Sequence, residues 1–315
     1  MVFRIVRYCS DDREVWNAFV SRARNSTFLF LRDYMDYHAD RFTDHSLMVW
    51  ADDRLVALLP ANVADNTLYS HAGLTYGGLV TGFGMQGATV LHIFEALVQY
   101  GRESGLSGLY YKPVPTIYHK APAQDDEYAL WRCGAQPYSC SLASAVGTGC
   151  AETVTARRKR EYCRQLERKG YSVRTDTPLH GYWPMLESCL KERYNAVPVH
   201  SLQEMTMLQE RFPDRIRCFT VHDCEGKLMG GLLLFLMDRV LRMQYSCSCE
   251  EGMESGAMTL LFERVLDFCR SEGFAYFDMG TSNGLPGNAL NESLEYWKWS
   301  FGGRGVAFKT YYLRF

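Results

Sequence analysis

One order of strand-like and helix-like segments occurs twice along the 315 residues, and it limits the fold more than any other property of the chain. Each copy contains three apolar strands joined by short polar turns, a glycine-bearing loop, a helix, another strand and another helix. In the first copy, strands are expected at 46–50, 55–61, 67–72 and 106–111, and helices at 87–103 and 127–133. In the second copy, strands are expected at 218–221, 228–237, 240–248, 274–279 and 306–313, and helices at 257–271 and 290–301.

Short sequence matches fall at equivalent places in the two copies. Gly87-Ala88 corresponds to Gly256-Ala257 at the start of the long helix, and Trp131-Arg-Cys-Gly134 corresponds to Trp299-Ser-Phe-Gly302 at the end of the next helix. A repeat of this length is a domain and not a solenoid unit. We therefore predict an α/β protein with two tandem domains, 1–150 and 151–315, each a mixed, mostly antiparallel sheet flanked by helices.

The composition argues against several classes of protein. With a net charge of −2 and 47% hydrophobic residues, the chain is globular and has no overall positive charge to hold nucleic acid nonspecifically. The longest apolar run, 228–237, is about half as long as a membrane-spanning helix, and the N-terminal residues contain no signal-like run. The 11 cysteines and 8 histidines show no metal-ligand spacing. We expect reduced thiols, no bound metal, no integral membrane association and a cytoplasmic location.

Three stretches of the second copy resemble motifs of one protein superfamily. They are Arg157-Arg-Lys-Arg160 to Val173, Phe277-Asp278-Met-Gly280, and Leu294-Glu-Tyr-Trp-Lys298-Trp-Ser-Phe-Gly302. With the order of elements, they resemble the tandem GNAT-fold transferases of the FemABX-like group. The resemblance implies an enzyme that carries aminoacyl groups from tRNA onto peptidoglycan precursors. The charged coiled-coil insertion of some family members is missing, and the family's Phe-Lys pair is Trp297-Lys298 here.

The resemblance implies that Lys298 stabilises the oxyanion formed during acyl transfer. A fixed cation beside that oxygen stabilises the transition state more than the ground state, and the aromatic neighbours of Lys298 favour its partial desolvation. The alternative is an ordinary solvated helix lysine. Asp278 ends a strand just before Gly280, and a carboxylate there could accept a proton from an attacking amine. Its alternative is a turn or cap aspartate.

Candidates for substrate binding lie in the same copy. Arg193 and Tyr194 follow an apolar helical segment, and an arginine guanidinium binds phosphate or carboxylate through paired hydrogen bonds. Tyr245, in the third strand of this copy, is a further candidate. An exposed helix end is the alternative for Arg193, and a cap or a packed ring is the alternative for the nearby His200.

The loops before the two long helices bear on the acyl donor. In coenzyme A-dependent GNAT proteins, backbone N–H groups at this position bind the pyrophosphate. The first copy offers His71 and Tyr76 as substrate-binding and Gly77 and Gly78 as cofactor-binding candidates, with tight turns as the alternative. Residues 250–256 contain three glutamates, which would repel a pyrophosphate. We expect no tightly bound cofactor, and acetyl-CoA and aminoacyl-tRNA are the donor substrates to be distinguished.

A basic segment precedes the second copy. Residues 157–169 contain seven basic and two acidic side chains, and at helical spacing Arg157, Arg160, Arg164 and Arg168 share one face. This face is either a surface for tRNA or a nucleotide-linked amine acceptor, or an ordinary solvated helix face.

Three functions remain open at this point. The first is an acyl or aminoacyl transferase with a site between the repeats, which moves an acyl group onto an amine acceptor while Lys298 polarises the carbonyl. The second is an acetyl-CoA-dependent N-acetyltransferase that uses one copy. The third is a non-catalytic binding protein that keeps the fold.

Overall fold

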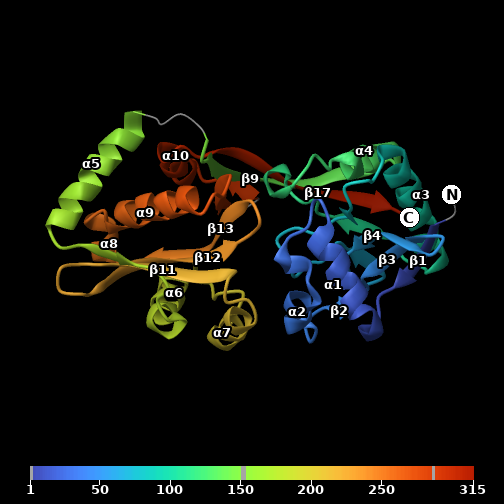
Figure 1. The fold of residues 1–315 in the computed structure, drawn as a ribbon, viewed down its shortest axis with the longest axis horizontal. Coiled ribbons are helices and arrows are strands. Elements are labelled where there is room, and N and C mark those ends of the chain that lie inside the picture. The colour runs from blue at the N-terminus through green and yellow to red at the C-terminus, as the bar shows by residue number, and fades with distance from the viewer. Residues whose placement is uncertain (1–2, 150–153, 286–287) are drawn as a thin grey trace. The chain divides into compact units, whose positions relative to one another are not determined.

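The computed structural model describes residues 3–149, 154–285 and 288–315, and it describes their side chains except those of residues 154–157, 194 and 285. The chain divides into two compact units, Met1–Ser141 with Ala307–Phe315, and Leu142–Val306. The boundary falls within two long strands, β9 (Gln136–Gly147) and β17 (Arg304–Arg314), which Figure 1 labels.

The N-terminal unit holds two sheets. Its elements are β1 (Phe3–Arg7), α1 (Arg13–Arg22), α2 (Arg32–Met35), β2 (Thr43–Asp44), β3 (Leu47–Ala51), β4 (Arg54–Leu59), β5 (Asn62–Ala64), β6 (Thr67–Tyr69), β7 (Val80–Thr81), α3 (Gly87–Glu103), β8 (Gly108–Tyr111) and α4 (Asp125–Arg132). The strand orders are β1-β3-β4-β7 and β17-β8-β6-β5-β2. The predicted apolar face of α3, with Ile93, Phe94 and Leu97, is buried against Leu109 and Leu313 of the second sheet.

Pro60 divides the first copy's second strand, which the sequence predicted as one run over 55–61. β4 ends at Leu59 and pairs with β3 and β7, whereas β5 begins at Asn62 and pairs with β6 and β2. A proline has no N–H to donate to a ladder, so the chain leaves one sheet and enters the other at this residue.

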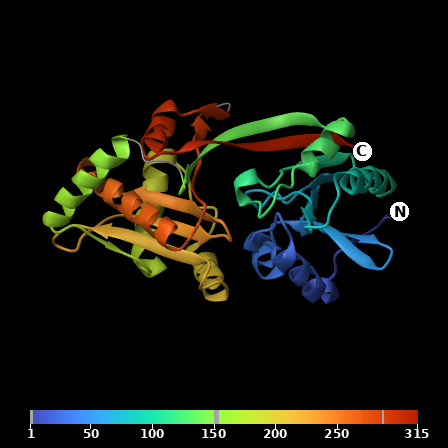
Figure 2. The same ribbon diagram turned by 45° about the horizontal axis from the view of Figure 1, so that its top comes forward.

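The C-terminal unit contains one large sheet covered by helices on both faces, and a separate two-stranded sheet. Its elements are α5 (Val154–Arg168), β10 (Ser172–Arg174), α6 (Leu179–Tyr194), α7 (Leu202–Arg211), β11 (Ile216–His222), β12 (Leu228–Leu236), β13 (Val240–Ser248), α8 (Glu250–Glu254), α9 (Ala257–Ser271), β14 (Tyr276–Thr281), β15 (Asn283–Leu285), β16 (Ala289–Leu290) and α10 (Glu292–Ser300). The strand order of the large sheet is β10-β11-β12-β13-β14-β9, and β15 pairs with β16 in the two-stranded sheet. Figures 1 and 2 show α9 on one face with α5 beside it, and α6 and α7 on the other face.

The last strand of each copy completes the sheet of the other unit. Residues 143–147 of β9 pair with β14 in the C-terminal unit, and residues 311–314 of β17 pair with β8 in the N-terminal unit. The sequence division at 150/151 assigned both strands to the copy that precedes them. Which strand completes a sheet depends on long-range pairing, which the order of elements along the chain does not record.

Candidate active site

The parallel pair β13–β14 separates partway along its length. Only Val240 to Arg242 pair with Tyr276 to Asp278, although β13 continues to Ser248 and β14 to Thr281. β13 also carries a bulge, because its register with β12 shifts between Leu233 and Leu234. Among the described residues, the last residues of β14 therefore have no strand partner on their β13 side, at the carboxyl end of a parallel pair where ligand sites of α/β sheets usually lie.

Lys298 lies at that end of β14. It comes from α10 with only 2% of its surface exposed, and its Nζ donates to the carbonyl oxygens of Gly280 at 2.8 Å and Thr281 at 2.7 Å. Burial lowers the pKa of Lys298 to about 8, while Asp278 raises it and Arg242 lowers it further. An ammonium has three donors, and these two bonds use two of them. Lys298 is thus a desolvated cation fixed at the end of β14, not a solvated helix lysine.

Asp278 is fully buried beside this lysine and is held on both oxygens. Its Oδ2 forms an ion pair with Nη1 of Arg242 at 2.9 Å, and its Oδ1 accepts a hydrogen bond from the backbone N–H of Gly280 at 2.8 Å. Gly280 has a φ of 72°, which favours glycine. Asp278 therefore holds the turn whose carbonyls bind Lys298, and this geometry agrees with the turn role weighed for it. Sequence reasoning missed Arg242, which lies opposite Asp278 only once β13 and β14 pair, so no local sequence pattern marks it.

Tyr245 and Arg193 lie toward the α6 face. The hydroxyl of Tyr245 and Nδ1 of the buried His200 are 2.8 Å apart, and the Tyr245 ring packs edge-on against Trp183 of α6. The exposed Arg193 donates from Nη2 to the carbonyl of Ser248 at 3.0 Å. Arg193 lines a pocket of about 560 Å³ between α6 and α8, so it remains a candidate for substrate contact. Tyr194 ends α6, and its side chain lies outside the described residues.

The second-copy loop before α9 is more ordered than expected. The sequence predicted a loop over 249–256, but residues 250–254 form the short helix α8, because Sγ of Cys249 accepts the N–H of Gly252 at 3.3 Å. The exposed Glu251 pairs with Lys227 at 2.6 Å. Tyr162 of α5 donates to the carbonyl of Ser255 at 2.8 Å. The acidic helix and the tyrosine leave this helix N-terminus poorly suited to a pyrophosphate.

The first-copy candidates His71, Tyr76, Gly77 and Gly78 are all buried. A Cβ on Gly77 would lie 1.8 Å from the carbonyl oxygen of Ser70, and Gly78 has a φ of 82°. Both glycines therefore serve close packing and a turn, and the role of the four residues in binding stays a prediction. They also do not precede a helix directly, because β7 and residues 82–86 come between them and α3.

Sequence reasoning missed the pocket that does lie at the start of α3. It has a volume of about 690 Å³, and Gly82, Gly84, Arg22 and Arg54 are among its lining residues. Gly82-Phe-Gly84 directly before the predicted helix is the signal that could have found it.

His71 gives the N-terminal unit a testable acid sensitivity. Its ring stacks on His38 with centroids 5.0 Å apart, and burial, His38, Lys112 and Arg32 lower its pKa to about 3. Between pH 6.5 and pH 3, the His71 side chain is therefore protonated in the unfolded chain and neutral in the folded chain. We expect the free energy of unfolding to fall by about 2 kcal/mol from pH 8 to pH 5 through this group.

Denaturant unfolding of the His71→Asn variant at pH 8 and pH 5 checks this expectation. Asparagine tolerates the left-handed φ of 59° at this position, so the variant should lose less stability on acidification than the wild type. His92→Asn, at an exposed position of α3, is the matched control and should keep the wild-type pH dependence. Equal losses in wild type and His71→Asn would contradict the assignment.

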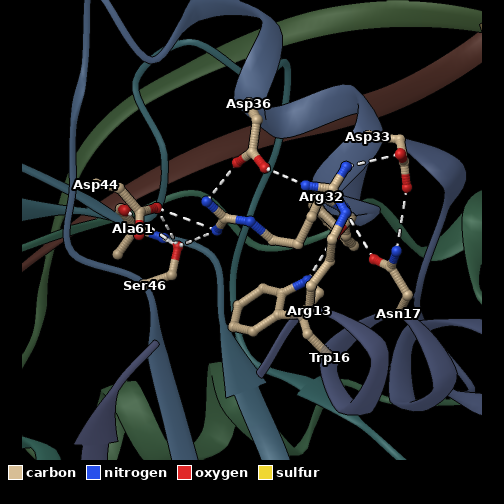
Figure 3. Close-up of polar contacts among 10 residues, drawn as sticks. Arg13, Trp16, Asn17, Arg32, Asp33, Asp36, Asp44, Ser46 and Ala61 are labelled. Carbon is tan, nitrogen blue, oxygen red and sulfur yellow. Dashed lines mark hydrogen bonds and ion pairs between the residues drawn. The ribbon is translucent and has the colours of Figure 1, made fainter. Parts of the chain in front are cut away.

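A polar cluster around the buried Arg32 ties α1 and α2 of the N-terminal unit to β2 (Figure 3). The guanidinium of Arg32 pairs with Asp36 at 2.5 Å and Asp44 at 3.2 Å, and Arg13 pairs with Asp33 at 2.7 Å and Asp36 at 3.0 Å. Three carboxylates thus surround two guanidinium groups, which makes this cluster a structural network. The sequence signal for it is the i,i+4 spacing of Arg32 and Asp36.

The basic helix predicted before the second copy is α5. Arg164 and Arg168 are exposed, Arg160 is half-buried, and the side chain of Arg157 lies outside the described residues. Arg164 pairs with Glu161 at 3.2 Å. Lys159 turns toward α10, where its Nζ donates to Oγ of Ser300 at 2.7 Å.

The chain is similar to known proteins in one sequence profile and in its fold. The sequence profile of the acetyltransferase (GNAT) domain matches residues 154–298, whereas no curated protein matches the chain. The fold is similar to that of FemX (TM-score 0.69, 10% identity, 99% of this chain and 97% of that chain covered). It is also similar to L-PGS from Bacillus licheniformis (0.59, 12%, 98% and 92%) and to a tandem GNAT protein from the clavulanic acid biosynthesis pathway (0.57, 12%, 99% and 98%).

These findings confirm the predicted tandem GNAT fold and the resemblance to FemABX-like proteins at the level of the fold, and they support a transferase. No helix in the described part of the chain is long and apolar enough to cross a membrane. Among the same residues, no cluster of histidine, cysteine, aspartate or glutamate side chains is suited to a metal ion.

Proposed function

We propose that this protein transfers an acyl or aminoacyl group onto an amine acceptor, with Lys298 as the group that stabilises the oxyanion. The observation that carries the proposal is the desolvated ammonium of Lys298, fixed by two carbonyl oxygens where β13 and β14 separate. A cation held in a low-dielectric site stabilises developing negative charge strongly and needs no reorganisation during the reaction. The remaining donor of Nζ is available for the carbonyl oxygen of a bound acyl group.

In this proposal Asp278 positions the site instead of acting as the base. Its ion pair with Arg242 and its bond from Gly280 N–H keep the strand-end carbonyls aimed at Lys298. Arg193 and Tyr245 supply substrate contacts on the α6 side, where the pocket beside Arg193 could admit an anionic or nucleotide-linked acceptor.

The proposed donor is aminoacyl-tRNA and not acetyl-CoA. The acidic helix α8 and the contact of Tyr162 with Ser255 disfavour a pyrophosphate at the start of α9, and the exposed basic residues of α5 suit an RNA phosphate backbone. The donor assignment also draws on the resemblance to FemABX-like transferases. A conventional N-acetyltransferase is the second candidate, because the pocket at the start of α3 leaves the N-terminal unit open to a coenzyme.

A thermal-shift comparison of coenzyme A, acetyl-CoA and UDP-linked peptidoglycan precursors tests these assignments. A ligand at about 100 times its Kd stabilises the folded state by about 2.7 kcal/mol, which is a shift of several degrees for a domain of this size. We expect stabilisation by the precursors and none by acetyl-CoA. Stabilisation by acetyl-CoA alone would instead favour the conventional acetyltransferase, and aminoacyl-tRNA transfer assays would then be negative.

A further inference from the structure

The helices α4 and α10 occupy equivalent places in the two copies, and each exposes one tyrosine ring and one tryptophan ring. In α10, Tyr296 is 66% and Trp299 is 43% exposed, and in α4, Tyr128 is 54% and Trp131 is 70% exposed. Large aromatic side chains in contact with each other on a surface usually mark a binding site, because burying them elsewhere would stabilise the fold. The spacing Tyr-x-x-Trp is common to both copies, so the pair is a repeated feature of the domain.

The two aromatic pairs differ in geometry. The rings of Tyr296 and Trp299 stack with an interplanar angle of 22° and centroids 5.6 Å apart, whereas Tyr128 and Trp131 are tilted at 37° and 6.2 Å apart. The α10 pair therefore presents an aromatic platform of more nearly parallel rings, on which another planar ring can stack.

The two aromatic pairs also differ in the cations that lie beside them. Arg304 places its guanidinium 5.9 Å from the centre of the Trp299 ring. Lys159 joins α5 to α10 through its bond to Ser300 and lies over the ring of Phe301, so the cations of α5 begin next to the platform. The exposed cations of α5 include Arg158, Arg164 and Arg168. The first turns of both helices are acidic, with Asp125, Asp126 and Glu127 in α4 and Glu292 and Glu295 in α10. The cation beside Trp131 is Arg132, so the α10 pair is distinguished by its link through Lys159 to the cations of α5.

We propose that Tyr296, Trp299 and Arg304 form a platform that stacks an unpaired base of a single-stranded RNA segment, whose phosphates follow the cations of α5. A stacked aromatic face beside a row of cations is the combination that single-stranded nucleic acid requires. Stacking accepts any base, so the platform adds affinity without sequence preference. Glu292 and Glu295, in the first turn of α10, disfavour a phosphate there and direct the strand toward Arg304 and α5.

The proposal rests on the proposed function for the role of the RNA, which would carry the donor group. Its test measures binding alone. If RNA binds through Trp299 while no transfer is found with any donor, the platform stands and the proposed function fails.

The experiment uses the full chain and a fluorescein-labelled single-stranded RNA of mixed sequence, about 12 nucleotides long, with fluorescence anisotropy as the readout. Trp299→Ala should weaken binding about 10-fold, which matches the loss of one base–aromatic stack. Arg304→Gln should lower the slope of log affinity against log salt by about one between roughly 50 and 200 mM salt. Trp131→Ala, the same change on the α4 pair, should leave affinity within about twofold.

Equal affinities for Trp299→Ala and Trp131→Ala would overturn the proposal. So would tight, Trp299-dependent binding to phosphatidylglycerol vesicles without RNA binding, since interfacial aromatics and cations also suit an anionic lipid surface. If Trp299→Ala does not fold, Tyr296→Ala gives the same test, because its ring is more exposed and its loss removes little packing.

Discussion

Replacing Lys298 with methionine is expected to slow acyl transfer at least about 100-fold while the C-terminal unit stays folded. Removal of one preorganised oxyanion donor has an effect of about 10²–10³ on kcat. The fold should survive, because the lowered pKa of Lys298 means that its buried charge costs about 3 kcal/mol relative to the neutral form. Methionine carries no charge, so this cost disappears. The gain offsets the free energy lost when the carbonyl groups of Gly280 and Thr281 lose their hydrogen-bond donor.

The pH dependence of the transfer rate tests whether the positive charge of Lys298, and not only its side-chain volume, is needed. The pKa of Lys298 is about 8, so the ammonium loses its proton as the pH rises through that value. The ratio of wild-type to variant rate should therefore be largest below pH 7 and fall above pH 8. Stability should not fall over the same range, because the unfolded chain holds this proton more tightly than the folded chain does.

Lys112→Met is the matched control for this substitution. Lys112 is a half-buried lysine whose pKa is also lowered to about 8 by desolvation, and it donates to the carbonyl of Leu74 at 2.5 Å, but it belongs to the N-terminal unit. The Lys112→Met variant should transfer at the wild-type rate per folded molecule. Its melting temperature reports whether the substitution reduces the amount of folded protein. Transfer at the wild-type rate by Lys298→Met would rule out the mechanism.

Local sequence patterns predicted the main strands and helices of the repeated order, although not the elements outside it, such as β1, α1 and α2. The three–four spacing of apolar residues predicted α3 and α9, and the polar turns predicted the β11–β12–β13 meander within a few residues of its observed bounds. Lys298 could be singled out because its segment resembles a motif of the FemABX-like transferases and because aromatic residues flank it. Its burial could not be read from the sequence, since helical periodicity places Trp297 and Lys298 on neighbouring parts of one turn.

The long-range contacts could not be predicted in the same way. In the sequence, Arg242 is an ordinary polar residue of a strand. Its ion pair with Asp278 depends on the pairing of β13 with β14. The pairing of β9 with β14 and of β17 with β8 joins residues far apart in the sequence, and local sequence patterns do not identify such partners. Cys249 caps α8 with a thiol, a weak acceptor that sequence rules for helix starts do not include.

Replacing Asp278 with asparagine is expected to lower the free energy of unfolding of the C-terminal unit by about 3–5 kcal/mol. The change leaves the guanidinium of Arg242, whose side chain is only 11% exposed, without its carboxylate. Asparagine is isosteric and can still accept the N–H of Gly280, so the loss reports the charge pair. Urea unfolding measures it, and adding Arg242→Met should recover part of the loss, because the pair then contains no unpaired buried charge.

Asp238→Asn is the control within the same unit. Its pair with Arg215 has both side chains 40% exposed, and such a pair contributes at most about 1 kcal/mol. Asp278→Asn should also move the pH at which transfer declines below 8, because Asp278 raises the pKa of Lys298. If the variant unfolds like the wild type and yet transfers nothing at any pH, Asp278 is the general base and not the residue that positions Lys298.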